Sequence, residues 1–301
     1  MSRTIIQADV LGFCAGVKSA MEIALKARRD FPAAKIFTFD QLIHNMEAIR
    51  FLERKKIYAL KKETALSAEH DFSDAIIIVC AHGIEVGAKE LLEKKFFRVI
   101  DATCPHVLQS QKKAFTAASE NFSVILVGEK NHQEILSLKS YVELADKKPC
   151  TVIANAAEAE AFSLCEDILP VCLIAQTTLK QSEYEQIIRV FSQKISAFYS
   201  DLHDTQLKVF KTICPATQKR QEALIKLAGA CDVVVVVGGK NSTNTNRLFR
   251  TALQLNPHSF LVENADELPP ELFSAQIIGI TAGASTPDFV LDEITKKLQN
   301  P

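Results

Sequence analysis

The sequence predicts an α/β protein made of three similar lobes, each built around a small parallel sheet. Two observations support this prediction. Short segments rich in Val and Ile alternate with longer stretches of helical periodicity, and a spacing of cysteines and polar motifs recurs along the chain. Regular alternation of strands and helices is typical of α/β folds with parallel sheets.

The predicted strands are short apolar segments with the length of buried parallel strands. They are residues 75–79, 124–127, 171–174, 233–237 and 277–280. The stretches between them have helical periodicity. Near the amino terminus, Val17, Ala20 and Met21 begin an i, i+3, i+4 pattern that Ala24 and Leu25 continue. These five side chains therefore share one face of a helix.

Three cysteines occupy the same kind of position, between a predicted strand and a predicted helix. Cys14 follows residues 5–10, Cys104 follows residues 99–103 and Cys214 follows residues 208–213. Pro105 and Pro215 come directly after two of these cysteines, and proline favours the first turn of a helix. We therefore expect each cysteine where a strand gives way to a helix.

Polar motifs repeat at matching distances from these cysteines. The first motif of each lobe begins 30, 28 and 27 residues after its cysteine, at His44, His132 and Asn241. The second begins 67, 72 and 67 residues after it, at residues 81, 176 and 281. We expect the three lobes to be residues 15–103, residues 104–211, and residues 1–14 together with 212–301.

The polar motifs all lie at the carboxyl ends of predicted strands. Ligands of open parallel sheets bind beyond these ends. If the lobes meet around a pseudo-threefold axis, the motifs converge on one central cavity.

The composition argues against several classes of function. Lys and Arg number 35 and Asp and Glu 36, and such a balance does not favour nucleic-acid binding through bulk electrostatics. No apolar run approaches the roughly 18–20 residues of a membrane span, and the amino terminus lacks the apolar stretch of a signal peptide. We expect a cytoplasmic protein with no nucleic-acid or membrane partner, in which the eight cysteines are not a disulfide framework.

The cysteines at the predicted helix starts suit a metal centre. Their setting separates them from Cys80, Cys172 and Cys231, which lie in or beside apolar strands and are expected in the core. A glycine on each side of Cys14, at positions 12 and 16, lets the backbone approach a bulky group. Three thiolates suit either zinc or an iron–sulfur cluster, and the spacing alone leaves both open.

Two further groups of residues suit a polyanion. His44, His82 and His132 each follow an apolar run at the end of a predicted strand, and histidines can donate hydrogen bonds to phosphate. Residues 238–244 follow a strand and precede a helix, where backbone N–H groups form an anion nest. Residues 281–285 have the same character. The small polar donors in these two segments are Ser242, Thr243, Asn244 and Ser285.

Glu134 is the candidate general acid, because it lies two residues past His132. In a closed pocket beside a diphosphate, the pKa of its carboxyl group would rise. It could then hold a proton at neutral pH and deliver it to a substrate.

Together these segments resemble the LytB family of 4-hydroxy-3-methylbut-2-enyl diphosphate reductases, the last enzymes of the non-mevalonate (MEP) isoprenoid pathway. The matching segments are residues 12–17, 44–45, 81–83, 101–105, 132–134, 176–179, 214 with 220–223, 240–244 and 281–285. They run in family order over nearly the whole chain. Any one of them is weak, but nine in register are highly specific.

The resemblance implies a trefoil of α/β lobes around one [4Fe–4S] cluster with three cysteine ligands, Cys14, Cys104 and Cys214, and one open iron. It implies reductive dehydroxylation of the allylic diphosphate to isopentenyl and dimethylallyl diphosphate, with two electrons from ferredoxin or flavodoxin. Glu134 would supply protons, and Thr177 would bind the substrate and orient its hydroxyl. The implied diphosphate contacts are His44, His82, His132, Ser242, Thr243, Asn244 and Ser285.

The chain departs from the family pattern at a few positions. Gln133 stands where proline is common, and Leu11 where arginine is frequent. Residues 135–137 lack the usual glycine, and Thr243 replaces a common serine but keeps a hydroxyl. We expect these changes to affect the loop that carries Glu134, and with it the rate, while leaving the implied metal ligands in place.

Two other functions are compatible with the residues themselves. One is a zinc hydrolase acting on a phosphorylated metabolite, and the other is an anion-binding sensor with a structural metal. Direct use of a nicotinamide cofactor is not expected, because the chain lacks a Gly-x-Gly-x-x-Gly fingerprint.

Overall fold

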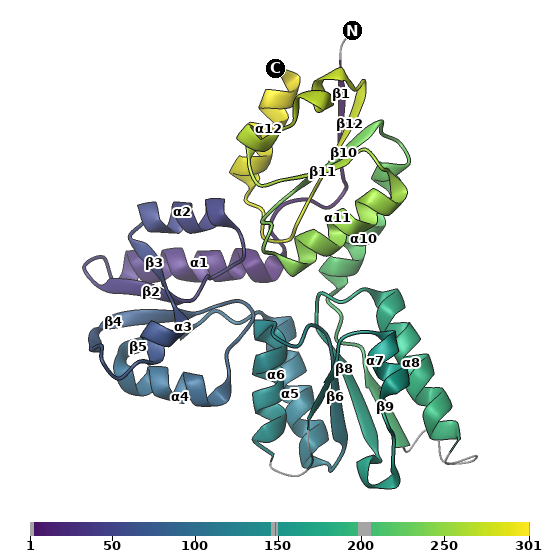
Figure 1. Cartoon of the computed structure of the whole chain (residues 1–301). Coiled ribbons are helices and arrows are strands. Elements are labelled where there is room, and N and C mark those ends of the chain that lie inside the picture. Colours follow the sequence, from purple (N-terminus) through teal and green to yellow (C-terminus); the bar gives the residue numbers. More distant parts are fainter. Residues whose placement is uncertain (1–2, 146–147, 149, 198–205, 301) are drawn as a thin grey trace.

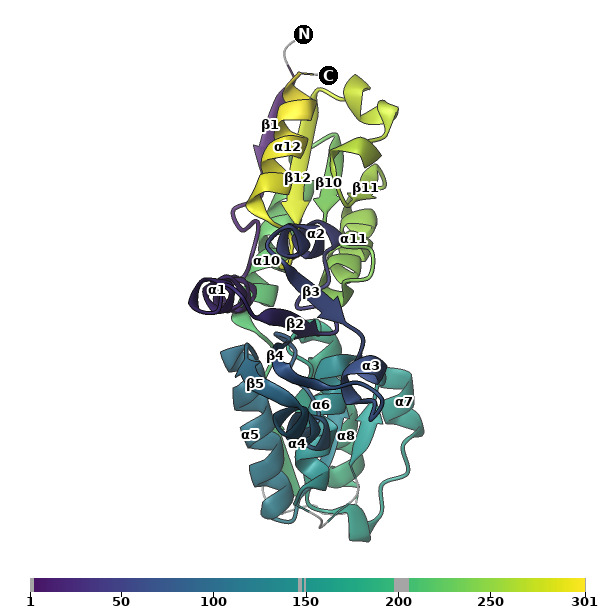
Figure 2. The ribbon, with the colours of Figure 1, turned by 90° about the vertical axis from the view of Figure 1, so that its left-hand side faces the viewer.

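Three parallel sheets of four strands each organise the part of the chain that the structure describes, residues 3–145, 148, 150–197 and 206–300. The structure is a computed structural model. With their helices, the sheets form three lobes around a common centre (Figure 1). A view at right angles shows that the lobes make a flat assembly (Figure 2).

The first lobe alternates helices and strands from the start of α1 to the end of β5. Its elements are α1 (Ala15–Asp30), β2 (Lys35–Phe39), α2 (Met46–Arg54), β3 (Ile57–Leu60), α3 (Lys62–Leu66), β4 (Phe72–Val79), α4 (Val86–Lys95) and β5 (Phe96–Asp101).

The second lobe follows the same plan. Its elements are α5 (Pro105–Ser119), β6 (Ser123–Val127), α6 (Gln133–Glu143), β7 (Thr151–Ile153), α7 (Ala156–Ala161), the 3-10 helix η1 (Glu166–Ile168), β8 (Val171–Ala175), α8 (Gln181–Ser196) and β9 (Leu207–Phe210).

The third lobe combines the two ends of the chain. Its elements are β1 (Thr4–Gln7), α10 (Pro215–Ala228), β10 (Val233–Val237), α11 (Thr243–Leu255), β11 (Ser259–Val262), the 3-10 helices η2 (Ala265–Glu267) and η3 (Pro270–Ser274), β12 (Ile277–Ala282) and α12 (Asp288–Gln299).

One strand order is common to the three sheets. The orders are β3-β2-β4-β5, β7-β6-β8-β9 and β11-β10-β12-β1, so the amino-terminal β1 takes the place that β5 and β9 hold in the other lobes. It pairs in parallel with β12, with Thr4 opposite Ile277. The predicted α/β fold of similar lobes is therefore confirmed, whereas the boundaries 15–103, 104–211 and 1–14 with 212–301 stay a prediction.

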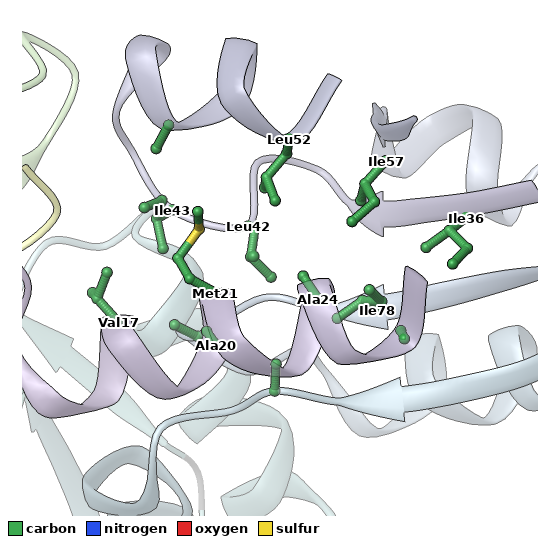
Figure 3. Close-up of a cluster of buried hydrophobic side chains, with 14 of the residues drawn as sticks. Val17, Ala20, Met21, Ala24, Ile36, Leu42, Ile43, Leu52, Ile57 and Ile78 are labelled. Atoms are coloured by element: carbon green, nitrogen blue, oxygen red, sulfur yellow. The ribbon is translucent and has the colours of Figure 1, made fainter. Parts of the chain in front are cut away.

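The core of the first lobe shows why the predicted helix and strands form. Val17, Ala20, Met21 and Ala24 on α1 are buried, and Leu25 is partly buried against the same cluster. Figure 3 shows the four buried α1 side chains facing those of the strands and α2. Residues 75–79 of β4 are buried on both faces of the sheet, as expected for an internal parallel strand. Among the described residues, no helix combines the length and apolar character that crossing a membrane requires.

Candidate active site

Each of the three candidate metal ligands is the N-cap residue of a helix. Cys14 precedes α1, Cys104 precedes α5 and Cys214 precedes α10. Pro105 and Pro215 occupy the first helical turns as predicted. The amino ends of these helices point toward the centre of the molecule (Figure 1).

One cavity brings together residues from all three lobes. The residues predicted from the sequence that line it are Cys14, Cys104, Cys214, His44, His82, His132, Thr177, Ser242, Thr243, Asn244 and Ser285. Glycine is required at position 16, because a Cβ atom there would collide with the thiol of Cys104. The first turn of α1 can therefore approach the start of α5 closely enough to share one site.

The thiols lie in surroundings that disfavour a bare charge. Burial raises the pKa of Cys104 and of Cys214, although backbone N–H groups in the first turn of each helix act in the opposite direction. A thiolate in such a place needs a cationic partner. A metal centre supplies one, since metal binding deprotonates the coordinating thiol.

The three thiols stand at the starts of three different helices around one cavity. Sulfur atoms in a tetrahedral zinc site lie within about 4 Å of one another, because each Zn–S bond is about 2.3 Å. Among the described residues, no group of three or more His, Cys, Asp and Glu side chains is placed to hold one metal ion. As positioned, the three thiols therefore do not form a single-ion site among the described residues.

The three candidate histidines are packed against one another. The rings of His44 and His82 stack with their centroids 4.9 Å apart. The ring of His132 stands edge-on to both, 6.4 Å from His44 and 5.3 Å from His82. The sequence alone did not predict this direct contact, because His44 and His82 follow different strands of the first lobe and His132 belongs to the second.

These histidines are held neutral without a ligand. Burial, with a smaller effect of the neighbouring rings, lowers the pKa of His82 well below its usual range. Burial and the nearby His44 lower the pKa of His132 to about 4. The Nδ1 atom of His132 accepts a hydrogen bond from the backbone N–H of Glu134 at 3.1 Å, so its proton is on Nε2. His132 can therefore donate a hydrogen bond to an anion from Nε2.

The start of α11 and the loop after β12 provide further polar groups. Ser242 is the N-cap of this helix, and its hydroxyl accepts a hydrogen bond from the N–H of Thr245 at 3.3 Å. The side-chain amide nitrogen of Asn244 is buried and has no hydrogen-bond partner. The hydroxyl of Ser285 donates to the carbonyl oxygen of His44 at 3.2 Å. A buried donor without a partner beside a helix amino end favours an anionic ligand.

Glu134 lies behind the cavity wall rather than on it. It is fully buried, and its two carboxylate oxygens accept hydrogen bonds from the N–H and hydroxyl of Thr177 at 2.7 and 2.8 Å. Burial raises the pKa of Glu134 to about 7, against the opposing effect of these hydrogen bonds. Thr177, which does line the cavity, therefore separates the carboxyl group from the ligand space.

Arg247 and Glu129 connect the second and third lobes, and no sequence motif identified either residue. Arg247 on α11 donates to the carbonyl oxygen of Thr178 at 2.7 Å and lies 3.4 Å from a carboxylate oxygen of Glu129. The other carboxylate oxygen of Glu129 accepts a hydrogen bond from the Thr243 hydroxyl at 3.0 Å. The network links Thr243, a candidate diphosphate contact, to the turn of Thr177 and Thr178, and Thr177 is the hydrogen-bond partner of Glu134.

Arg220 belongs to the matching segment 220–223, but the sequence assigned it no role. It is buried and shares a helix face with Ala223, Leu224 and Leu227, which are also buried. An arginine at an apolar position of a predicted amphipathic helix is the signal that would have identified it.

The residues that depart from the family pattern have structural partners. The amide of Gln133 donates to the carboxylate of Glu85 in the first lobe at 3.1 Å. Ile135, in the segment without glycine, is fully buried in the core of the second lobe. Leu11 packs against the core of the third lobe. Thr243 retains the hydroxyl function of serine and uses it on Glu129.

Comparison with known proteins gives concordant results. A model of the LytB protein family matches residues 5–299. The chain is 43% identical over 297 residues to the 4-hydroxy-3-methylbut-2-enyl diphosphate reductase of Treponema denticola, covering 97% of this chain and 98% of that protein. It is 34% identical over 296 residues to the protein of the same name from Aquifex aeolicus, covering 98% and 96% of the two chains.

Two solved structures resemble the whole chain. One, of (E)-4-hydroxy-3-methyl-but-2-enyl diphosphate reductase, the terminal enzyme of the non-mevalonate pathway, is 33% identical, has a TM-score of 0.69 and covers 99% of this chain and 100% of its own. The other, the E-1-hydroxy-2-methyl-but-2-enyl-4-diphosphate reductase from Plasmodium falciparum, is 25% identical, has a TM-score of 0.85 and covers 100% of this chain and 89% of its own.

Proposed function

The chain belongs to the LytB family, and on this premise we propose that it converts 4-hydroxy-3-methylbut-2-enyl diphosphate to isopentenyl and dimethylallyl diphosphate. The reaction consumes two electrons and two protons and releases the allylic hydroxyl group as water. The relatives that match nearly the full chain are named for this reductase activity. The observation that carries the proposal is one cavity lined by three thiols and by donors for a diphosphate.

The residues present fit a [4Fe–4S] cluster on Cys14, Cys104 and Cys214. The thiols stand at the starts of three helices and line one cavity. Three ligands leave one iron of the four without a protein ligand. Such a cluster supplies single electrons and an open iron that acts as a Lewis acid.

The diphosphate has donors from all three lobes. We assign its binding to His44, His82, His132, Ser242, Thr243, Asn244 and Ser285, which line the cavity. Because the diphosphate does not itself react, its contacts provide remote binding energy that can position the hydroxyl group. The unpartnered amide nitrogen of Asn244 gains a hydrogen bond when an anion is present.

Glu134 and Thr177 form the proton-delivery pair. With a pKa of about 7, the buried Glu134 carboxyl group is protonated in a large fraction of molecules at neutral pH. When the carboxyl group is protonated, it donates to the Thr177 hydroxyl oxygen, 2.8 Å away, and the Thr177 hydroxyl proton is then free to point into the cavity. The Glu134 proton passes to this oxygen as the Thr177 proton passes to the substrate. Thr177 thus orients the substrate hydroxyl and relays the proton.

Ferredoxin or flavodoxin is the proposed electron donor. A cluster that accepts electrons singly requires a one-electron donor, and the chain lacks a dinucleotide fingerprint. The cytoplasmic location expected from the sequence stays a prediction.

Oxygen-free purification followed by metal analysis tests the proposal. We expect a brown protein with iron and acid-labile sulfide that turns over the allylic diphosphate when given reduced ferredoxin. A colourless zinc protein with hydrolase activity would instead support the zinc-enzyme alternative. A protein that binds the diphosphate but never reduces it would support the sensor alternative.

Diphosphate binding is expected to take up protons. The pKa values of His44, His82 and His132 are lowered in the free protein, to about 4 for His132, and a bound polyanion raises them. Between the free and bound pKa values, the complex holds more protons than its components, so affinity falls as pH rises through this window. Below about pH 4, His132 is already charged and this dependence weakens.

Calorimetric titration of inorganic diphosphate measures this uptake. At pH 7, buffers of different ionisation enthalpy should give apparent binding enthalpies that differ in proportion to the protons taken up. The variant His82→Gln should take up fewer protons, whereas His258→Gln, outside the cavity, should match the wild type. Equal enthalpies in all buffers would contradict protonation of these rings.

A further inference from the structure

Arg220 is a buried cation whose position the diphosphate chemistry does not explain. Only 2% of its surface is exposed, and it is among the largest fully buried side chains. Removing a guanidinium group from water is costly unless an opposite charge lies nearby.

The hydrogen-bond partners of Arg220 are all neutral. Its Nη1 atom donates to the carbonyl oxygens of Ala282 at 3.0 Å and Val10 at 3.4 Å. Its Nη2 atom donates to the carbonyl oxygen of Gly12 at 3.0 Å, and its buried Nε has no partner. These backbone carbonyl groups orient the guanidinium group, but they carry no net negative charge to balance it.

The acidic groups that act on Arg220 are thiols. Burial lowers the pKa of Arg220, and the causes that act in the opposite direction are Cys14 and Cys214. No carboxylate forms an ion pair with it within the ranges that the structure describes. The guanidinium group is bonded to the carbonyl oxygen of Gly12, two residues before Cys14, and extends from the helix that begins after Cys214. It therefore lies near the ligands of the proposed cluster without a carboxylate of its own.

Other arginines of the chain show what a purely structural role looks like. Arg3 donates to the carbonyl oxygens of Leu298 and Phe273 at 2.6 and 2.7 Å, and Arg28 donates to several carbonyl oxygens near the end of α1. Both are only half-buried, so water stabilises their charge. Arg220 has the same kind of acceptors but no access to water, which distinguishes it from them.

We propose that Arg220 is the internal counter-cation of the iron–sulfur cluster and raises its reduction potential. This inference rests on the proposed function, since it requires the cluster. Each electron added makes the cluster more negative, so a fixed positive charge stabilises the reduced state more than the oxidised one. The low dielectric of the site strengthens the effect.

Arg220 is also a positioning residue. Its acceptors Val10 and Gly12 lie on the segment that leads to Cys14, and Ala282 ends β12 just before the loop of Ser285. Arg220 itself is on α10, which begins at Cys214. One side chain thus joins two cysteine-bearing segments, and any test must separate its charge from this packing role.

The variants Arg220→Lys and Arg220→Gln make that separation. Both shorten the side chain and keep a hydrogen-bond donor, but only lysine keeps the charge. Redox titration of the oxygen-free holoenzyme, followed by electron paramagnetic resonance, should show a lower potential for Arg220→Gln than for Arg220→Lys. We expect at least a tenfold difference in the reduction equilibrium, which is about 59 mV for a one-electron couple.

Arg3→Gln is the matched control, because it removes a guanidinium group bonded to backbone carbonyls of the same lobe but outside the cavity. Its potential should equal that of the wild type. If Arg220→Gln folds by circular dichroism but loses its iron while Arg220→Lys keeps it, the charge is needed to hold the cluster and the inference stands.

Two results would overturn the counter-cation role. One is equal potentials for the lysine and glutamine variants, and the other is loss of iron from both, since lysine retains the charge. Neither result affects the proposed function, which depends on iron, sulfide and turnover in the wild-type protein. A wild type without a cluster would instead refute the proposed function itself.

Discussion

Replacing Cys104 with serine is expected to remove the iron–sulfur cluster and the reductase activity together. Serine oxygen is a poor replacement for a thiolate in an iron–sulfur site. Loss of residues that only support metal ligands costs about 10–100-fold, so loss of a ligand should reduce turnover by more than about 100-fold. Iron and sulfide analysis and the rate with reduced ferredoxin measure both effects on one preparation.

The fold should survive this substitution. Cys104 is the N-cap of α5 but makes no side-chain capping hydrogen bond, whereas serine is a preferred N-cap residue. A loss of iron therefore reports on ligation rather than on an unravelled helix. The control Cys165→Ser changes an exposed cysteine outside the cavity and should keep full iron. Wild-type iron content in Cys104→Ser would remove Cys104 from the ligand set.

The repeated lobes could be predicted because the strands and helix starts of each lobe depend on short-range sequence patterns. A buried parallel strand such as β10 is a run of five valines, and proline after a cysteine fixes where a helix starts. Residues 1–14 were assigned to the third lobe from the sequence. The structure agrees in one respect, because β1 is the fourth strand of the third sheet. Periodicity and spacing therefore predicted the buried strands β4, β6, β8, β10 and β12, whereas the strand order of each sheet comes from the structure.

The site was predictable as a set of residues but not as a set of contacts. The spacing identified His44 and His132, yet their packing depends on how the first and second lobes dock. The same holds for Arg247, whose partner Glu129 belongs to another lobe. Local patterns carry no information on such docking, because His44 and His132 are 88 residues apart in the sequence and Arg247 and Glu129 are 118 residues apart.

The role of Glu134 could be predicted from the sequence, but its position behind Thr177 could not. The sequence predicted an acid with a raised pKa beside the ligand. The structure gives the raised pKa but places Thr177 between the carboxyl group and the cavity. Burial of the helix face that carries Glu134, Ile135 and Leu138 is the cause, because it draws the carboxyl group into the interior.

Glu134→Gln is therefore expected to bind substrate normally and almost stop turnover. Glutamine has the shape of glutamate, and its amide can still accept a hydrogen bond from the N–H of Thr177. Because the diphosphate contacts are unchanged, KM should change little. Loss of a general acid reduces kcat by about 10²–10⁴-fold, and single-turnover measurements with the prereduced enzyme isolate that step.

The pH dependence of the wild type gives an independent check on the same assignment. A group that must be protonated loses its function as pH rises through its pKa, so kcat should fall above about pH 7 if Glu134 is the acid. That fall should be absent from the residual rate of Glu134→Gln. The control Glu143→Gln makes the same change at the exposed far end of α6 and should retain both the wild-type rate and its pH profile. If Glu134→Gln also retained the wild-type rate and pH profile, the protons would have to come from another group. The substitution removes the acidic proton of this buried side chain while keeping its shape.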